Sequence, residues 1–209
     1  MILALMAGSA YFAQSAIRTA AIAVPVRHSM LVRITHWVHT ISFFGLLVSG
    51  IAILLAHPRL YWGEVGNVDT PSIIDLPLPF VLTGQTGWGR SLHFLSAWVC
   101  VIDGLLYVAS GFVTRRFLRN PPEYRVSQCT VYLGVVFVLL PLMIWTGFAM
   151  SPAITSAFPI LVTSLGGQQS ARTIHCFVTG MLVLFLMVHV VMVLVTRRVT
   201  GMITGRERV

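Results

Sequence analysis

Histidine is the residue type whose spacing in this chain indicates chemistry. Seven histidines occur among 209 residues, of which 56% are hydrophobic. His175 and His189 lie 14 residues apart in one apolar stretch. At the 3.5-residue period of a helix in a supercoiled bundle, both rings face the same way, about 21 Å apart along the axis. A lone histidine in such a stretch more often bonds a backbone carbonyl, but ionisable groups inside a membrane are costly and functional by default.

Two further histidines supply a partner for each of His175 and His189. His36 begins one apolar stretch and His93 begins the next. Because successive stretches cross a membrane in opposite directions, His93 shares the level of His175, and His36 shares the level of His189. Facing imidazoles from two helices are the axial ligands that a six-coordinate, low-spin haem iron takes. Zinc or copper would need three or four ligands converging on one point. The pattern therefore predicts two haem-binding pairs, one in each leaflet.

Four apolar stretches must position these histidines. A hydrocarbon layer about 30 Å thick needs about 20 apolar helical residues, and the stretches 31–56, 91–114, 128–150 and 171–196 are long enough. Lipid offers no partners for backbone groups, so each stretch is a predicted helix. Only 10% of the residues are charged and the mean hydropathy is +0.86, which excludes a soluble globule. We predict an all-α membrane four-helix bundle with two b haems between its helices.

This bundle forms one predicted domain over residues 26–209. Residues 1–25 are an apolar segment whose character stays open: an interfacial helix, a fifth span, or sequence upstream of the true start. No internal repeat is evident. The bundle itself is therefore the only part of the chain to which we assign a function.

The distribution of arginine predicts the orientation of the chain. All fourteen basic residues are arginines that flank the apolar stretches, so the net charge of +8 does not indicate a nucleic-acid partner. Eleven of them lie on the side of both termini and three on the other side. The positive-inside rule then puts both termini in the cytoplasm and the connections 57–90 and 151–170 on the opposite side of the membrane.

Several polar residues near the predicted pairs are further candidates. Asp103 lies mid-span, ten residues after His93 and about 15 Å further inward. It is a candidate proton relay to a quinone, a group that tunes the inner haem, or a hydrogen-bonded packing residue. His39 projects one turn from His36 and is a candidate quinone contact, a support for that ligand, or packing. Four arginines lie at depths suited to haem propionates or to plain interfacial anchoring: Arg33, Arg90, Arg172 and Arg197.

The motifs around the histidines resemble those of a known family. The first span opens with Arg33-Ile34-Thr35-His36-Trp37, and the second opens with Gly89-Arg90-Ser91-Leu92-His93-Phe94. The stretches 56–64, 146–152 and 166–175 continue the likeness. Together they resemble the bacterial diheme cytochrome b and nickel-hydrogenase cytochrome-b membrane subunits, in the branch of thiosulfate-reductase-type cytochrome b. The resemblance covers roughly residues 25–205.

The resemblance implies a function as well as a fold. It implies a four-helix diheme b-type cytochrome of the inner membrane that passes electrons between the quinone pool and a periplasmic redox partner, often a molybdopterin oxidoreductase. Carried over by motif, the axial ligands are His36, His93, His175 and His189. Relatives often have Asn where this chain has His39, and the connection 115–127 looks shorter than is common, which affects the inner quinone site.

Three functions remain to be separated. The first is the electron-transfer subunit just described. The second is a standalone membrane haem reductase that passes electrons to a metal ion or oxygen, which would need an open haem position that paired histidines close. The third is a transporter or anchor without haem, which would need polar groups at mid-membrane and broken helices. No arrangement of nucleophile and general base is visible, so we expect a partner to catalyse the final chemistry.

Overall fold

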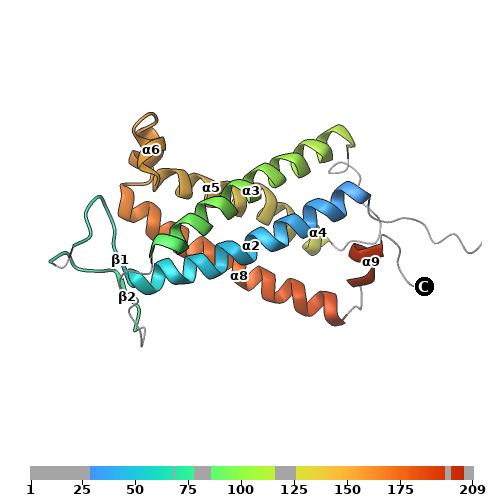
Figure 1. The fold of residues 1–209 in the computed structure, drawn as a ribbon, viewed down its shortest axis with the longest axis horizontal. Helices are drawn as coiled ribbons and strands as arrows, with labels where there is room; N and C mark the ends of the chain where they lie inside the picture. Colours follow the sequence, from blue (N-terminus) through green and yellow to red (C-terminus); the bar gives the residue numbers. More distant parts are fainter. Residues whose placement is uncertain (1–28, 68, 78–85, 116–125, 196–198, 205–209) are drawn as a thin grey trace, which may run out of the picture. The chain divides into compact units, whose positions relative to one another are not determined.

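Long helices make up most of the structure, a computed structural model that describes residues 29–67, 69–77, 86–115, 126–195 and 199–204. Three of them are unbroken: α2 (Met30–Ala56), α3 (Thr86–Val113) and α8 (Gln168–Val195). The fourth combines α4 (Val126–Gly134), a π-helical segment (Val135–Leu139) and α5 (Leu140–Ala149) (Figure 1). All four are long and apolar enough to cross a membrane. The predicted all-α four-helix bundle is confirmed, whereas the segment 1–25 lies outside the described residues.

A proline explains why the third span is built in three parts. Pro141 has no N–H, and its ring would collide with the carbonyl group four residues earlier in a regular helix. The chain widens into a π turn just before it, where the N–H of Leu140 bonds the carbonyl of Val135, five residues back. Backbone angles stay helical on both sides, at Gly134 and at Leu139. The span is therefore one continuous helix with a local bulge.

The second span begins earlier than the sequence indicates. The glycines at 87 and 89 predict a loop up to Arg90, yet α3 begins at Thr86. Gly89 is buried, and a Cβ atom added to it would lie 3.4 Å from the Cβ of Ala52. Close packing of two helices therefore outweighs the low helix propensity of glycine. The first span ends at Ala56 as predicted, and the other span ends differ from the predicted ones by one to three residues.

Small residues line the interior of the bundle. On α2 the buried residues are Thr35, Ser42, Ser49 and Ala52. The first three lie seven residues apart, which is the spacing of one helix face in a bundle. The buried residues of α8 include Ser170, Ala171 and Thr173. In lipid, helices associate through close packing and hydrogen bonds rather than through the hydrophobic effect, so small and hydroxyl side chains suit the interior.

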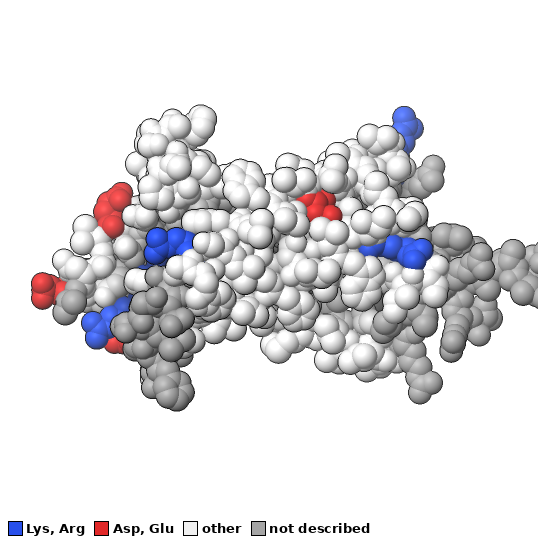
Figure 2. All heavy atoms as spheres, viewed as in Figure 1, with Lys and Arg blue, Asp and Glu red and all other residues white. Residues whose placement is uncertain are grey.

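Large apolar side chains point away from the bundle. Phe44 is 53% exposed, Trp98 is 52% exposed and Met187 is 55% exposed. The face drawn in Figure 2 consists mostly of uncharged side chains. This reversal of the pattern of a soluble protein is what a lipid environment requires.

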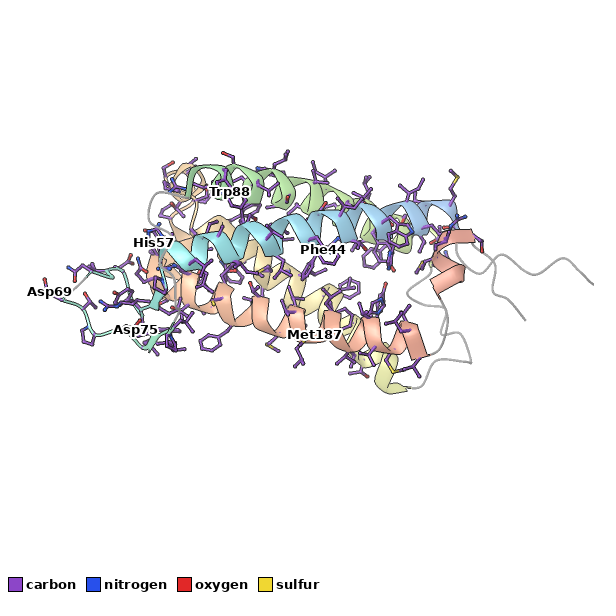
Figure 3. The ribbon with its side chains drawn as sticks, turned by 60° about the horizontal axis from the view of Figure 1, so that its bottom comes forward. Phe44, His57, Asp69, Asp75, Trp88 and Met187 are labelled. Carbon is purple, nitrogen blue, oxygen red and sulfur yellow. The ribbon has the colours of Figure 1, made fainter. Side chains whose placement is uncertain are left out.

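The connection between α2 and α3 is ordered where it is described. Two short strands, β1 (Arg59–Leu60) and β2 (Ile74–Asp75), pair in antiparallel fashion. Asp75 lies 3.1 Å from Arg59 and raises the pKa of that guanidinium, but both side chains are about half exposed, so the ion pair adds little stability. Figure 3 shows His57 and Asp75 at the end of α2, with Asp69 further out in the loop.

The same connection is tied to the beginning of α8. The carbonyl of Gly63 accepts hydrogen bonds from the N–H groups of Gln169 (3.0 Å) and Ser170 (3.3 Å), which would otherwise lack partners at a helix start. Thr173 donates its hydroxyl to the carbonyl of Tyr61 at 2.6 Å. Gly167, at a φ of +114°, leaves room for this contact, because a Cβ there would lie 2.5 Å from the Gly63 carbonyl. The loop and the α8 start therefore form one packed body.

The described residues fall into two compact units. The larger is Thr35–Val190 and contains all the contacts between helices discussed below. The smaller combines residues before Thr35 with residues after Val190. Within it, Arg33 donates hydrogen bonds to the carbonyls of Met202 and Ile203 in α9 (Val199–Thr204). A cation near the C-terminus of a helix is favourable because carbonyl groups are left exposed there.

Candidate functional site

One pair of histidines lies between α3 and α8. The ring centres of His93 and His175 are 6.3 Å apart, and the ring planes are inclined by 58°. His93 lies two turns into α3, and His175 lies two turns into α8. Both rings therefore lie near the end of the bundle at which α3 and α8 begin. Most of the buried helix residues around that end are small.

A second pair lies between α2 and α8. The ring centres of His36 and His189 are 6.4 Å apart, with planes inclined by 42°. His189 also stacks on Phe185 at 5.8 Å, and His36 meets Trp37 edge-on at 5.4 Å. The structure thus brings together the same two pairs that the sequence predicts, with α8 contributing one ring to each.

The separation within each pair suits a metal held between two imidazoles. A metal–imidazole bond is about 2.0–2.1 Å long. In a five-membered ring with bonds near 1.33 Å, each atom lies about 1.1 Å from the centre. Two rings that bind one metal from opposite sides therefore have centres about 6.3 Å apart. The measured values of 6.3 and 6.4 Å match this, so the residues present fit an iron with two axial imidazoles.

Hydroxyl groups orient the rings of the first pair. The Oγ atom of Ser49 on α2 lies 3.0 Å from the Nδ1 atom of His93, and the Oγ1 atom of Thr146 on α5 lies 2.8 Å from the Nδ1 atom of His175. Each hydroxyl also reaches carbonyl groups of its own helix, which can only accept, so its proton goes there. Each Nδ1 atom is then a donor, and the Nε2 lone pair stays available to a metal.

Arg90 and Arg172 each precede a histidine of the first pair by three residues, and the two arginines have different surroundings. Arg172 donates to the carbonyl of His57 and lines an open cavity of about 510 Å³ with Arg59 and Asp75. Arg90 is exposed. Arg33 bonds α9 as described above, and Arg197 lies outside the described residues. Arg172 therefore has the surroundings most suited to an anionic group at this end of the bundle.

A polar cluster lies between α2 and α3, and its His39 is one turn along α2 from His36. The Nδ1 atom of His39 is 3.7 Å from the Oδ2 atom of Asp103, and the Sγ atom of Cys100 is 3.5 Å from the same nitrogen. Asp103 is only 6% exposed. One turn further along α3, the hydroxyls of Tyr107 and Tyr132 are hydrogen-bonded to each other. Among the described residues, no group of three or more His, Cys, Asp or Glu side chains is placed to hold a metal ion.

Comparison with known proteins assigns the family. A model of the family described as prokaryotic cytochrome b561 matches residues 27–205. The chain belongs to the prokaryotic cytochrome b561 family. As a member of the cytochrome b561 family it is a membrane b-type cytochrome that binds haem and transfers electrons. The resemblance stated from the motifs is thereby confirmed.

A curated relative extends the comparison beyond the family. The protein named "Putative protein-methionine-sulfoxide reductase subunit YedZ1" of Azospira oryzae is 28% identical to this cytochrome b561 homologue. The match covers 85% of this chain and 96% of the relative. No solved structure gave a significant match. The relative's name describes it as a subunit of a protein-methionine-sulfoxide reductase.

Sequence reasoning missed the two hydroxyl residues of the first pair. Ser49 and Thr146 lie in apolar spans, where a hydroxyl most often bonds the carbonyl group one turn back in its own helix. Ser42 on α2 bonds the carbonyl of Val38 in this way. The signal that could have found Ser49 and Thr146 is a recurrence in the sequence, in which each hydroxyl residue is followed by glycine and, two residues later, by alanine.

Proposed function

We propose that this chain carries electrons across a bacterial inner membrane through two b haems, one bound by His36 and His189 and the other by His93 and His175. The observation that carries this proposal is the separation within both pairs, which equals that of two imidazoles on one metal. Haem supplies one-electron transfer, while the chain supplies ligands, charge and an apolar surround that set its potential. The spacing of His175 and His189 puts the two sites about 21 Å apart along α8.

The orientation of the chain assigns the two sites to opposite surfaces. Eleven of fourteen arginines lie on the side of both termini, so that side is cytoplasmic in our proposal. His93 and His175 then form the outer site, and His36 and His189 form the inner site. Arg90 and Arg172 are the candidate contacts of the outer propionates, and Arg33 and Arg197 are those of the inner propionates.

A quinone is the proposed exchangeable substrate on the inner side. Oxidation or reduction of a quinone moves protons as well as electrons, so its site needs groups that hold protons. His39 and Asp103, 3.7 Å apart, supply such a pair, in which Asp103 is buried and His39 is partly exposed. Asp103 is proposed to exchange the proton and His39 to contact the quinone. This role accounts for an acid within an apolar helix, which is costly without a function.

The partner is proposed to be a periplasmic oxidoreductase, of the molybdopterin type that the family resemblance implies. The relative's name includes a methionine sulfoxide reductase activity, which supports an enzyme that reduces an oxidised substrate. The described loop residues 57–77 lie beside the outer site and expose Trp62 at 58% and Asp75. They form the proposed docking surface, because a partner there would be close to the outer haem.

The deciding experiment is the absorption spectrum of the purified full-length chain. We expect a reduced-minus-oxidised spectrum of b type and a pyridine haemochrome assay that gives two haems per chain. His175→Ala and His189→Ala should each leave one haem, and the two single-haem proteins should titrate at different potentials. Binding of carbon monoxide by the reduced wild type would favour the standalone reductase instead, because it requires an open iron position. Two haems in both alanine variants would refute the ligand assignment.

A further inference from the structure

The first histidine pair is held by two segments of similar sequence. The outer half of α2 contains Val48-Ser49-Gly50-Ile51-Ala52-Ile53, and the end of the third span contains Trp145-Thr146-Gly147-Phe148-Ala149-Met150. Both read as an apolar residue, a hydroxyl residue, glycine, an apolar residue, alanine and an apolar residue. The two alanines are buried, at 5% and 1% exposure. The segments therefore share residue types and burial.

The spans that follow these segments also match each other. Gly89-Arg90-Ser91-Leu92-His93 lies near the start of α3, and Ala171-Arg172-Thr173-Ile174-His175 lies near the start of α8. Each has a small residue, arginine, a hydroxyl residue, a branched aliphatic residue and histidine in the same order. The small residues are buried in both. Hence the helix pair α2 and α3 repeats, around the histidines, the pair formed by the third span and α8, and the expectation that the chain has no internal repeat is wrong in this region.

The contacts of the two copies agree atom by atom. Besides its contact with the Nδ1 atom of His93, the Oγ atom of Ser49 lies 2.6 Å from the carbonyl oxygen of Gly45, four residues earlier, and 3.1 Å from that of Leu46, three residues earlier. The matching distances of Thr146 are 2.9 and 3.0 Å. A Cβ atom added to Gly50 would lie 3.7 Å from the Cε1 atom of His93, and one added to Gly147 would lie 3.7 Å from the Cε1 atom of His175. Chance back-bonding of hydroxyls would not reproduce all of these contacts.

We propose that the outer haem site consists of two equivalent half-sites, in which Ser49 and Thr146 are positioning residues that jointly set its reduction potential. This inference rests on the proposed function, since it takes His93 and His175 as the ligands. A ligating imidazole that donates its other N–H becomes a stronger base and favours oxidised iron, so each hydroxyl lowers the potential. The equivalence of the copies requires that the two hydroxyls act to a similar extent.

The test compares Ser49→Ala, Thr146→Val and the double variant with two matched controls. Ser42→Ala removes a buried hydroxyl of α2 that bonds only the carbonyl of Val38, and Thr179→Val removes one of α8 that bonds the carbonyl of His175. The readouts are haem content and a redox titration, made in the wild type and in a His189→Ala background that keeps only the outer haem. Neither readout depends on turnover.

We expect each single variant to keep two haems and to shift the reduction equilibrium of the outer haem about fivefold toward the reduced state. At 59 mV per tenfold, this raises the reduction potential of the outer haem by about 40 mV. The double variant should show the sum of the shifts, while the inner haem and both controls stay unchanged. A shift from one hydroxyl only, or shifts in the controls of the same size, would refute the equivalence of the half-sites.

A second set of variants covers loss of haem. If Thr146→Val loses the outer haem, Thr146→Ser and Ser49→Thr, which keep the hydroxyl, should retain it at the wild-type potential. Loss or a shifted potential in these conservative variants would show that side-chain shape rather than the hydroxyl matters, and would overturn the inference. Failure of the proposed function is distinguishable, because then His175→Ala itself would keep both haems.

Discussion

Asp103 is the residue whose burial most needs a function. It is 6% exposed within a span, and the Nδ1 atom of His39 lies 3.7 Å from its carboxylate. A carboxyl group that only packed helices together could be replaced by an amide without consequence, whereas one that carries a proton could not. The neighbouring hydroxyl pair of Tyr107 and Tyr132 extends polar groups along the same side of α3. These contacts favour the proton-exchange role over simple packing.

Replacement of Asp103 by Asn tests that role. We expect Asp103→Asn to bind both haems but to slow haem reduction by a water-soluble quinol about tenfold or more, because the amide cannot exchange a proton. Stopped-flow absorbance measures the rate. The matched control is Asp69→Asn, the same change in an exposed loop position, which should leave the rate unchanged. A normal rate in Asp103→Asn would eliminate the relay.

At the scale of elements, the start of α8 depends on its contact with the loop. Gly63 supplies the carbonyl that accepts two N–H groups of the first turn, and Gly167 must lack a Cβ for that approach. The turn concerned precedes His175 by less than two helical turns. The loop therefore contributes to the position of a proposed ligand.

A methyl group at Gly167 should separate the loop from the helix. Gly167→Ala would put its Cβ 2.5 Å from the Gly63 carbonyl at a positive φ, which costs at least about 1–3 kcal/mol. We expect a lower thermal midpoint in detergent and faster proteolysis within residues 57–77. Gly180→Ala serves as the control, since its Cβ would meet nothing within 4 Å. Equal behaviour of the two variants would show that the contact adds no stability.

The sequence predicts those features that lipid or helix periodicity imposes. Four spans follow from the length of the apolar stretches, and the pairing of the histidines follows from their spacing and the alternating direction of the spans. Three features were not predictable in this way: the early start of α3 at Thr86, the π turn before Pro141 and the hydrogen bonds between Gly63 and the start of α8. They depend on contacts between segments distant in sequence or on local adjustment of a helix, which override propensity. The bonds of Ser49 and Thr146 belong to the same class.

For the whole molecule, the orientation in the membrane decides which histidine pair faces the periplasm. The arginine distribution predicts cytoplasmic termini and an outer loop in the periplasm. Alkaline phosphatase, which is active only in the periplasm, should be inactive when fused after Val209 and active when inserted between Asp69 and Thr70. Fusions of a fluorescent protein that folds in the cytoplasm should give the opposite result. The reverse pattern would exchange the outer and inner assignments of the two histidine pairs.

The hydrogen bond between Thr173 and the Tyr61 carbonyl has a consequence for partner binding. Thr173 precedes His175 by two residues, so this hydrogen bond attaches the loop backbone to the helix turn that carries the His175 imidazole. If the proposed soluble enzyme binds the loop, it contacts a segment that is bonded directly to this turn. Docking is then expected to perturb the proposed ligand His175, and a change in the visible absorption of the outer haem should accompany docking even when no electron is transferred.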